Sequence, residues 1–365
     1  MAYTTIDDPS AYFQAKGYAG NSVDNTAITN DGNSNLQPDL IWFARYDTPG
    51  DKFLLNSSRG VTKFLISSGT DAEGTSTSIV KSFDTNGFSV GTNSNSNSSS
   101  SNYVAWQWKA NAGTTSTNTD GSINTTVQAN TDAGFSIVGY TCPDPITNFT
   151  IGHGLGVTPD VIIVKTRDGS RNWGVYHKSL TAPAENRNLK LNLTNAEAAE
   201  STFWANTAPT SSVITIAQNA SVNFQGHNYI AYCFAEKQGY SKFGKYVGNG
   251  NSLGDGPFVY TGFAPSFVII KRTDAANDWI MHTYKLGTKA SSAVEKGNVG
   301  NLNNAALRAN SNSFVDDWGA IDMLSNGFKI RTDAASENTS GGSYIYMAFA
   351  ENPFTTSTGI PTTAR

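Results

Sequence analysis

The sequence YVAWQWKAN at residues 103–111 recurs in altered form as YIAYCFAEKQ at 229–238 and YIYMAFAENP at 344–353. Each copy combines aromatic and β-branched residues, which favour a pleated strand. Self-similarity along a chain is the sequence signature of repeated structural units. We therefore expect each copy to be the closing strand of one of three related repeats.

Two further landmarks precede each closing strand. A strand that begins with proline occurs as PDLIWFAR at 38–45, PDVIIVKTR at 159–167 and PSFVIIKR at 265–272. Proline costs no ladder hydrogen bond at the first residue of a strand. Upstream of it lies an aromatic and glycine-containing segment around Tyr18, Tyr140 and Tyr246. The intervals from tyrosine to proline are 20, 19 and 19 residues, so spacing supports the repeat independently of residue identity.

A fourth landmark appears in the outer repeats only. FDTNGFSVGT at 83–92 and LSNGFKIRT at 324–332 place Asn-Gly between strand-like segments. This dipeptide is preferred in tight hairpin turns. The middle repeat has SSVITIAQN at 211–219 instead, which keeps a strand pattern and lacks the turn signature.

The composition agrees with a β-protein whose surface is polar and uncharged. Charged residues make up 15% of the 365 residues, well below the roughly 25% of ordinary soluble domains. The net charge of −4 offers no broad basic face, so we expect no nucleic-acid partner. We expect no membrane insertion either, since no stretch approaches about 18 consecutive apolar residues, and the N-terminal segment lacks the pattern of a secretory signal. Cys142 and Cys233 are expected to be small buried hydrophobes.

These observations predict an all-β fold of three tandem β-sandwich repeats, jelly-roll or lectin-like, with a few short helices. The predicted repeats are residues 1–111, 112–238 and 239–365. The segment 111–134 is expected to be an extended linker or an edge strand, and 91–102 an exposed hairpin tip. Only 195–205 and 302–310 have a helical character, of a turn or two.

No motif gives a strong catalytic signal. His153 lies in a glycine-rich loop, and His227 is expected to be exposed in a hairpin tip. His177 and His282 occupy similar places in two repeats, which favours a structural role inherited with the fold.

The carboxylates are no clearer. Asp316 and Asp317 are adjacent, so in a strand they would point to opposite faces and could not form a catalytic pair. Glu236 and Glu351 recur at the ends of closing strands, which favours a strand-end or interdomain contact. The loop 248–256 contains a single carboxylate, that of Asp255, too few for a calcium site. We therefore expect no enzyme activity, no metal and no cofactor.

The remaining candidates are aromatic residues suited to sugar recognition, where a ring face covers the C–H surface of a sugar. Trp42, Trp106 and Trp108 lie in the repeated strands and are expected to fill cores. The tryptophans outside these strands are the better ligand-binding candidates: Trp173, Trp204, Trp279 and Trp318.

Taken together, IDDPSAYFQ near the start, SSRGVTKFL at 57–65, SFDTNGFSVG and the closing-strand motifs resemble structural proteins of marine tailed bacteriophages. The resemblance covers nearly the whole chain and supplies no catalytic or binding residues. It implies a virion component assembled in the host cytoplasm, either a tail fibre or appendage subunit or a capsid decoration protein. A glycan depolymerase is a further alternative. The implied partners are other virion proteins and a host surface glycan or receptor, with a homotrimer expected by analogy with fibres.

Overall fold

The repeated motifs form three adjacent antiparallel strands in every repeat. The computed structural model describes residues 3–251, 255–286, 302–303, 305–313 and 321–362. In each repeat the closing strand lies between the lead-in strand and the opening strand. These triplets are β1 (Phe13–Ala19), β9 (Asn102–Trp108) and β3 (Leu40–Arg45) in repeat 1; β12 (Phe135–Thr141), β19 (Asn228–Phe234) and β14 (Val161–Thr166) in repeat 2; and β20 (Ser241–Val247), β28 (Ser343–Pro353) and β22 (Phe263–Arg272) in repeat 3. The predicted strands are confirmed.

The strand registers make the three repeats equivalent residue by residue. Each lead-in tyrosine lies opposite the first tyrosine of its closing strand, in the pairs Tyr18 with Tyr103, Tyr140 with Tyr229 and Tyr246 with Tyr344. The rings are stacked in all three pairs, with centroids 5.1, 5.3 and 5.0 Å apart. Opposed aromatic pairs stabilise neighbouring strands, so this contact is the shared anchor of the repeat.

The other strands extend each triplet and add a second, smaller sheet. Repeat 1 adds β4 (Lys52–Asn56), β5 (Lys63–Ile66) and β6 (Gly74–Thr75), with the small sheet β2 (Thr26–Thr29), β8 (Gly87–Val90) and β7 (Val80–Asp84). Repeat 2 adds β10 (Ser116–Asn118), β11 (Thr125–Asn130), β15 (Gly174–His177), β16 (Arg187–Lys190) and β17 (Ala198–Ala199), with the small sheet β13 (Phe149–Gly152) and β18 (Val213–Ile216). Repeat 3 adds β23 (Trp279–Thr283) and β25 (Ala306–Arg308), with the small sheet β21 (Phe258–Tyr260), β27 (Gly327–Ile330), β26 (Ile321–Leu324) and β24 (Leu302–Asn303). The all-β class is confirmed.

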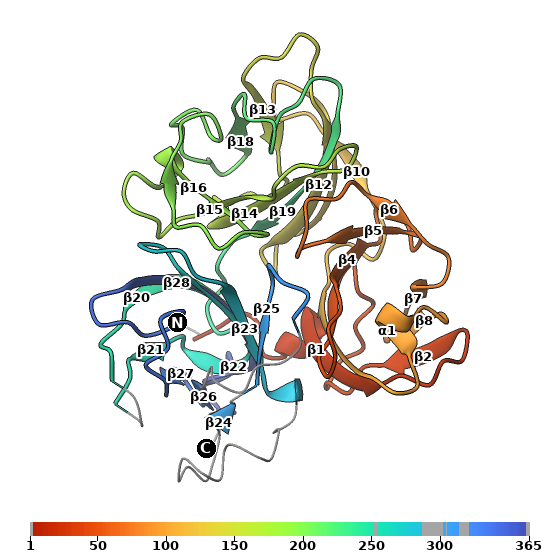
Figure 1. The fold of residues 1–365 in the computed structure, drawn as a ribbon, viewed down its shortest axis with the longest axis vertical. Helices are drawn as coiled ribbons and strands as arrows, with labels where there is room; N and C mark the ends of the chain where they lie inside the picture. Colours follow the sequence, from red (N-terminus) through yellow and green to blue (C-terminus); the bar gives the residue numbers. More distant parts are fainter. Residues whose placement is uncertain (1–2, 252–254, 287–301, 304, 314–320, 363–365) are drawn as a thin grey trace.

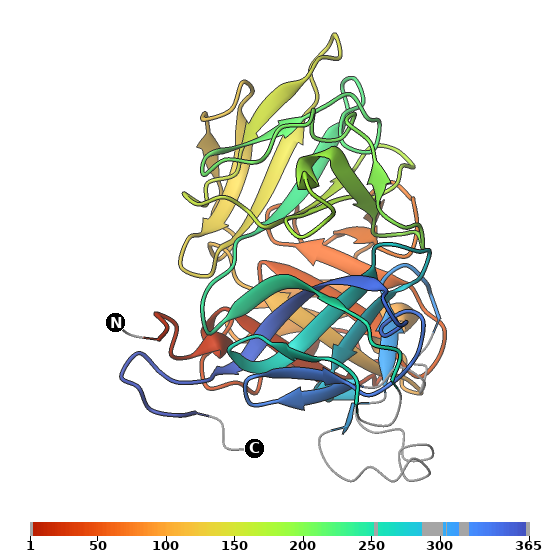
Figure 2. The ribbon, with the colours of Figure 1, turned by 90° about the vertical axis from the view of Figure 1, so that its left-hand side faces the viewer.

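The three lobes surround a common centre, with the large sheets inside and the small sheets outside (Figures 1 and 2). In β3, Ile41 and Phe43 point into the core of their own lobe. The alternate residue Trp42 belongs to a central core that also contains residues of the other two repeats, such as Tyr232 and Phe349. The large sheets are therefore buried on both faces, which explains why their strands are almost continuously apolar.

Hydrogen bonds connect each repeat to the next and close a ring. Buried lysine ammonium groups donate across all three boundaries to backbone carbonyls, at 2.8 to 2.9 Å: Lys165 to Thr70, Lys271 to Thr194, and Lys52 to Ser313. Burial lowers the pKa of each of these lysines to about 8. Because the third contact joins repeat 3 back to repeat 1, the arrangement is cyclic.

Two local predictions are wrong. The segments 195–205 and 302–310 are not helical where described, since they contain the strands β17, β24 and β25 and turns. The loop 91–102 is not a simple exposed tip, because the short helix α1 (Ser94–Asn97) buries Ser96 and Asn97. The segment 111–134 contains the edge strand β10, as predicted, and also β11, which is an inner strand between β10 and β12. Cys142 and Cys233 are buried and unpaired with each other.

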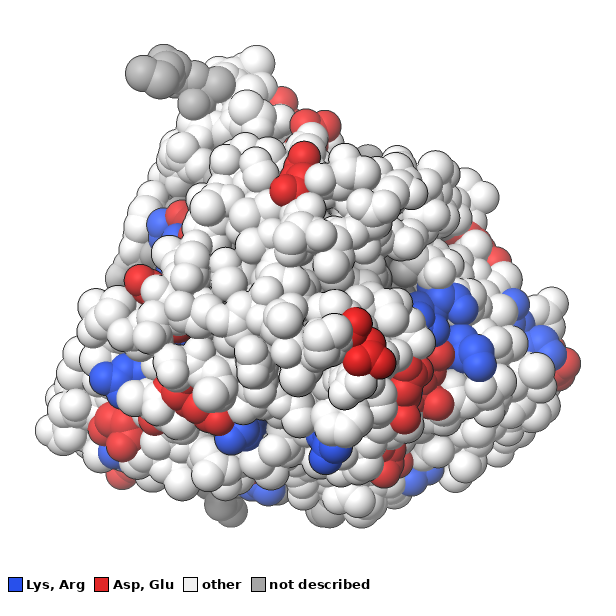
Figure 3. All heavy atoms as spheres, turned by 90° about the horizontal axis from the view of Figure 1, so that it is seen from above, with Lys and Arg blue, Asp and Glu red and all other residues white. Residues whose placement is uncertain are grey.

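The surface is mostly neutral. Seen from the repeat 2 end, lysines, arginines and carboxylates are scattered over a largely uncharged face (Figure 3). This agrees with the low charged fraction of 15%.

Candidate functional site

Three of the four tryptophans predicted to bind sugar are core residues. Trp173, Trp204 and Trp279 are 0%, 1% and 3% exposed, so none presents a ring face to solvent. Trp173 and Trp279 lie at the inner edge of a boundary between repeats, where their indole N–H groups donate to Ile66 O and Lys190 O. This corrects the prediction that they bind sugar: Trp279 lies on β23, Trp173 directly precedes β15, and Trp204 is buried in the turn at 201–206. Trp318 lies outside the described residues.

His177 and His282 are not equivalent positions. His177 lies opposite Val161, whereas the corresponding Phe267 lies opposite Thr283. The one-residue offset turns the two rings to opposite faces of their sheets. His177 faces the central core, with Nε2 3.1 Å from Tyr346 O, and burial lowers its pKa to about 4. His282 faces its own small sheet, with Nε2 2.6 Å from the buried Glu337 carboxylate.

The other candidates also have structural surroundings. His153 is buried, with Nε2 3.2 Å from Thr210 O, and His227 is half-buried. Glu236 forms ion pairs with Lys178 of its own repeat and Lys242 of the next, as expected of a strand-end contact. Asp316 and Asp317 lie outside the described residues.

A polar groove of about 270 Å³ lies at the boundary between repeats 1 and 2. Its floor is the large sheet of repeat 2, where Thr126 on β11, Gly139 on β12 and Ile230 on β19 are directly opposed. Repeat 1 supplies one wall through Ser58 and Arg59, in the turn between β4 and β5. Arg167, which follows β14, lines the groove beside Arg59, since both contact Glu73. We call this the boundary groove, and its remaining lining residues are Asn124, Tyr140, Thr141 and Asn228.

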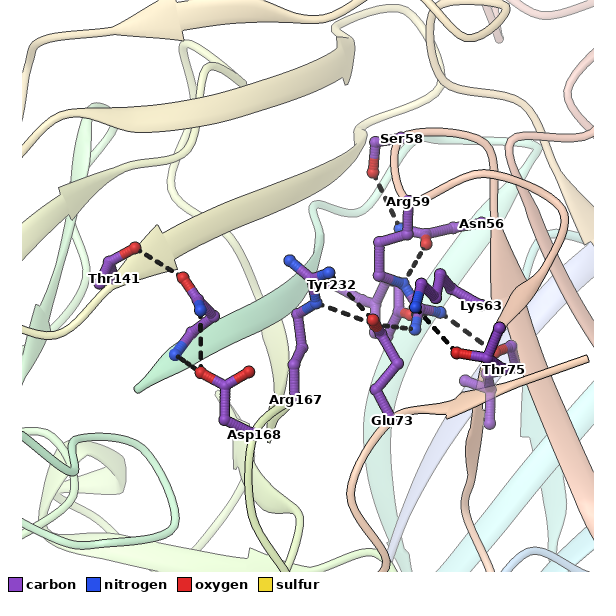
Figure 4. Close-up of polar contacts among 12 residues, drawn as sticks. Asn56, Ser58, Arg59, Lys63, Glu73, Thr75, Thr141, Arg167, Asp168 and Tyr232 are labelled. Atoms are coloured by element: carbon purple, nitrogen blue, oxygen red, sulfur yellow. Dashed lines mark hydrogen bonds and ion pairs between the residues drawn. The ribbon is translucent and has the colours of Figure 1, made fainter. Parts of the chain in front are cut away.

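Two arginines of the boundary groove share one carboxylate (Figure 4). Arg59 Nη1 lies 2.8 Å from Glu73 Oε2, and Arg167 donates to both Glu73 oxygens, from Nε at 2.8 Å and from Nη2 at 3.0 Å. Burial by itself would raise the pKa of the Glu73 carboxyl, but hydrogen bonds from Arg167 and Arg59 outweigh it and leave that pKa below its ordinary value. The carboxylate is therefore ionised, and the triad carries one net positive charge.

The Arg59 guanidinium is buried and hydrogen-bonded within the protein, whereas part of the Arg167 guanidinium is exposed and has no partner among the described residues. Arg59 is 2% exposed and also donates to Asn56, Leu54 O and the Tyr232 hydroxyl. Arg167 is 30% exposed, and among the described residues its Nη1 has no hydrogen-bond partner. Arg59 fixes Glu73, and Glu73 in turn orients Arg167 at the groove.

The described residues of repeats 1 and 3 do not reproduce the floor of the boundary groove. Gly139 corresponds to Lys245 in repeat 3 and to Gly17 in repeat 1, because all three lie opposite the second residue of the closing-strand motif. A Cβ added to Gly17 would lie 2.8 Å from Lys285 O, so that site is covered, whereas at Gly139 the nearest atom would be 3.8 Å away. The strand β11 is also an addition of repeat 2. The groove is not a by-product of the repeat.

A family model described as a domain of unknown function (DUF7483) matches residues 8–353. The chain belongs to this family. No curated protein and no solved structure gave a match.

The DUF7483 family assignment covers all three repeats, including the boundary groove. In the described part of the chain, no group of three or more His, Cys, Asp or Glu side chains is placed to hold a metal ion. No helix there is long and apolar enough to cross a membrane.

Sequence reasoning missed the groove because its components are remote from one another. Arg59 and Glu73 belong to repeat 1, whereas Arg167 belongs to repeat 2 and lies 94 residues after Glu73. The available signal is weak: Arg59 lies in a Ser-Ser-Arg-Gly turn of a chain with few charges.

Proposed function

We propose that this protein is a structural component of a tailed-bacteriophage virion, a tail fibre or appendage subunit that binds a saccharide of the host surface in the boundary groove. The observation that carries the proposal is the groove itself, a concave polar site at a boundary between two β-sandwiches. The protein assembles into the virion in the host cytoplasm, and its other partners are virion proteins.

The groove has the size and chemistry for one or two sugar units. Its volume of about 270 Å³ is just below the roughly 300 to 1,000 Å³ of sites for drug-sized molecules. Sugar hydroxyls both donate and accept hydrogen bonds. Asn124 and Thr126 line the groove with an amide and a hydroxyl that have no partner among the described residues. Both side chains are exposed.

We propose that the saccharide is bound and not hydrolysed. A second groove, which contains two carboxylates, is the place where the alternative depolymerase activity can be tested. Asp31 and Glu351 both line a groove of about 190 Å³ between repeats 3 and 1. Burial works to raise the pKa of Asp31, but Lys16 and Lys285, at 3.1 and 3.3 Å, outweigh it and hold the pKa below its ordinary value. A glycosidase general acid must be protonated to protonate the leaving group, so Asp31 does not suit that one role.

Capsid decoration is the second candidate function. The closed ring of repeats favours it, since three lobes around one core make a compact block rather than an elongated fibre. Locating the chain in an intact virus particle by electron microscopy distinguishes the tail-fibre function from capsid decoration. Density on the tail supports receptor contact, and density over the capsid shell supports decoration.

Saccharide binding is tested by filling the groove. The chain is screened against host-derived oligosaccharides by calorimetry, together with Gly139→Gln and the matched control Gly69→Gln. Gly69 lies in a surface turn where an added Cβ meets only Asp71, at 3.5 Å. We expect saturable binding that falls at least about tenfold in Gly139→Gln and is kept in Gly69→Gln. Absence of saturable binding, or binding unchanged by Gly139→Gln, contradicts the proposal, and glycan turnover lost in Glu351→Gln would replace it with the depolymerase.

A further inference from the structure

We infer that the saccharide taken by the boundary groove is acidic, with a carboxylate that pairs with Arg167. This inference rests on the proposed saccharide binding and adds the chemical class of the ligand. It starts from the charges that face the groove. Both charged lining residues are arginines, and the lining contains no carboxylate, since Glu73 lies behind the arginines.

The free edge of Arg167 has the geometry that a carboxylate requires. A guanidinium offers two forks of parallel N–H groups, and each can bind a carboxylate through two hydrogen bonds. Glu73 occupies the fork formed by Nε and Nη2. The fork formed by Nη1 and the second Nη2 hydrogen stays available on a side chain that is 30% exposed and lines the groove.

Arg167 is held in place before any ligand arrives. Its backbone carbonyl accepts from Glu73 N at 2.8 Å, and its own N–H donates to Asn228 O at 2.8 Å. Together with the bidentate contact to Glu73, these bonds fix both ends of the residue, so little side-chain entropy remains to be lost on binding. The nearby Asp168 carboxylate accepts from Asn228 N and Nδ2 at 2.6 and 2.8 Å. This carboxylate partly offsets the positive charge of Arg167, but it is hydrogen-bonded to Asn228 and is not among the residues that line the groove.

The sugar ring would then lie over the floor of the groove. Thr126, Gly139 and Ile230 leave an open strip there, because Gly139 has no side chain. Asn124 and Thr126 reach the hydroxyls at one end, and Arg167 reaches the carboxylate at the other.

The test compares uronic-acid oligosaccharides with neutral oligosaccharides of the same linkage and length, and with sulfated ones. The full chain, Arg167→Gln and the surface control Arg187→Gln are titrated by calorimetry. We expect the uronate to bind at least about tenfold tighter than the neutral sugar, with weaker binding at high salt. Arg167→Gln removes most of that preference and leaves neutral binding within about twofold, whereas Arg187→Gln changes neither. Thermal unfolding checks that Arg167→Gln is folded. We expect it to be, because Glu73 still pairs with Arg59 in this variant.

Each other result is decisive. Equal binding of uronate and neutral sugar overturns the acidic class but leaves saccharide binding standing. Tighter binding of the sulfated sugar overturns the assignment of a carboxylate. Uronate preference that survives in Arg167→Gln overturns the role of Arg167. If no saccharide binds the folded chain, the proposed function fails as well.

Discussion

His177 shows how one buried polar residue can make stability depend on pH. Burial lowers its pKa to about 4, while a hydrogen bond to Tyr346 O and the charge of Lys178 make smaller changes. In the unfolded chain its pKa is about 6.5, so between these values the unfolded state binds more protons. The contribution of neutral His177 to the free energy of unfolding is therefore complete above about pH 6.5 and is lost as the pH falls toward 4.

The repeat itself supplies a variant to test this effect. Asn56 occupies the equivalent position in repeat 1, since it lies opposite Leu40 as His177 lies opposite Val161. We expect wild type to lose roughly 3 kcal/mol more stability than His177→Asn between pH 6.5 and pH 4. Urea unfolding followed by circular dichroism at each pH measures the difference. The half-buried His227→Asn serves as control, and parallel stability curves for wild type and His177→Asn would refute the prediction.

At the scale of elements, the contacts between repeats are repeated as faithfully as the strands. Trp173 Nε1 donates to Ile66 O at 3.0 Å, and Trp279 Nε1 donates to Lys190 O at 3.1 Å. Ile66 lies opposite Phe53, and Lys190 lies opposite Gly174, which corresponds to Phe53 in repeat 2. The two bonds are thus the same contact at successive boundaries.

This contact can be measured against an internal control. Trp204 is also buried, but its Nε1 has no hydrogen-bond partner in the described part of the chain. Replacing each tryptophan by phenylalanine keeps a ring, so all three variants lose a similar apolar area. We expect Trp173→Phe and Trp279→Phe to lose about 1 kcal/mol more unfolding free energy than Trp204→Phe, from the broken hydrogen bond. Equal losses in denaturant unfolding would show that the bonds contribute nothing.

The same elements mark what the sequence could predict. The strands followed from the sequence because the paired tyrosines keep one register in all three repeats, and a fixed register shows as fixed spacing. The Asn-Gly signals also lie in hairpins, although Gly87 and Gly327 close the turns opposite Asp84 and Leu324 rather than lying at their centres. The buried tryptophans and the Arg59, Glu73 and Arg167 triad depend on which repeat lies beside which. No spacing along the chain encodes that arrangement.

At the scale of the molecule, three copies of one sandwich form a cyclic assembly within a single chain. The boundaries are all of one kind, with the edge of one large sheet against the opening hairpin of the next. Such heterologous contacts form a closed ring only when the rotations between successive copies add up to a full turn. A single chain therefore has an approximate threefold arrangement of its repeats (Figure 1). The homotrimer of chains expected by analogy with fibres remains a prediction.

A shared core predicts that the three repeats unfold together. The central core draws on every repeat, so the loss of one lobe would expose apolar faces of the other two. Calorimetry should give one transition, with equal calorimetric and van't Hoff enthalpies. Phe88→Ala removes a buried ring from the lobe core of repeat 1 and should shift the whole transition downward, by about 3 to 5 kcal/mol in stability. The exposed Phe258→Ala should leave it in place. If the repeats were independent, Phe88→Ala would instead split off one early transition and leave the rest unmoved, and the isolated fragment 112–238 would fold by itself.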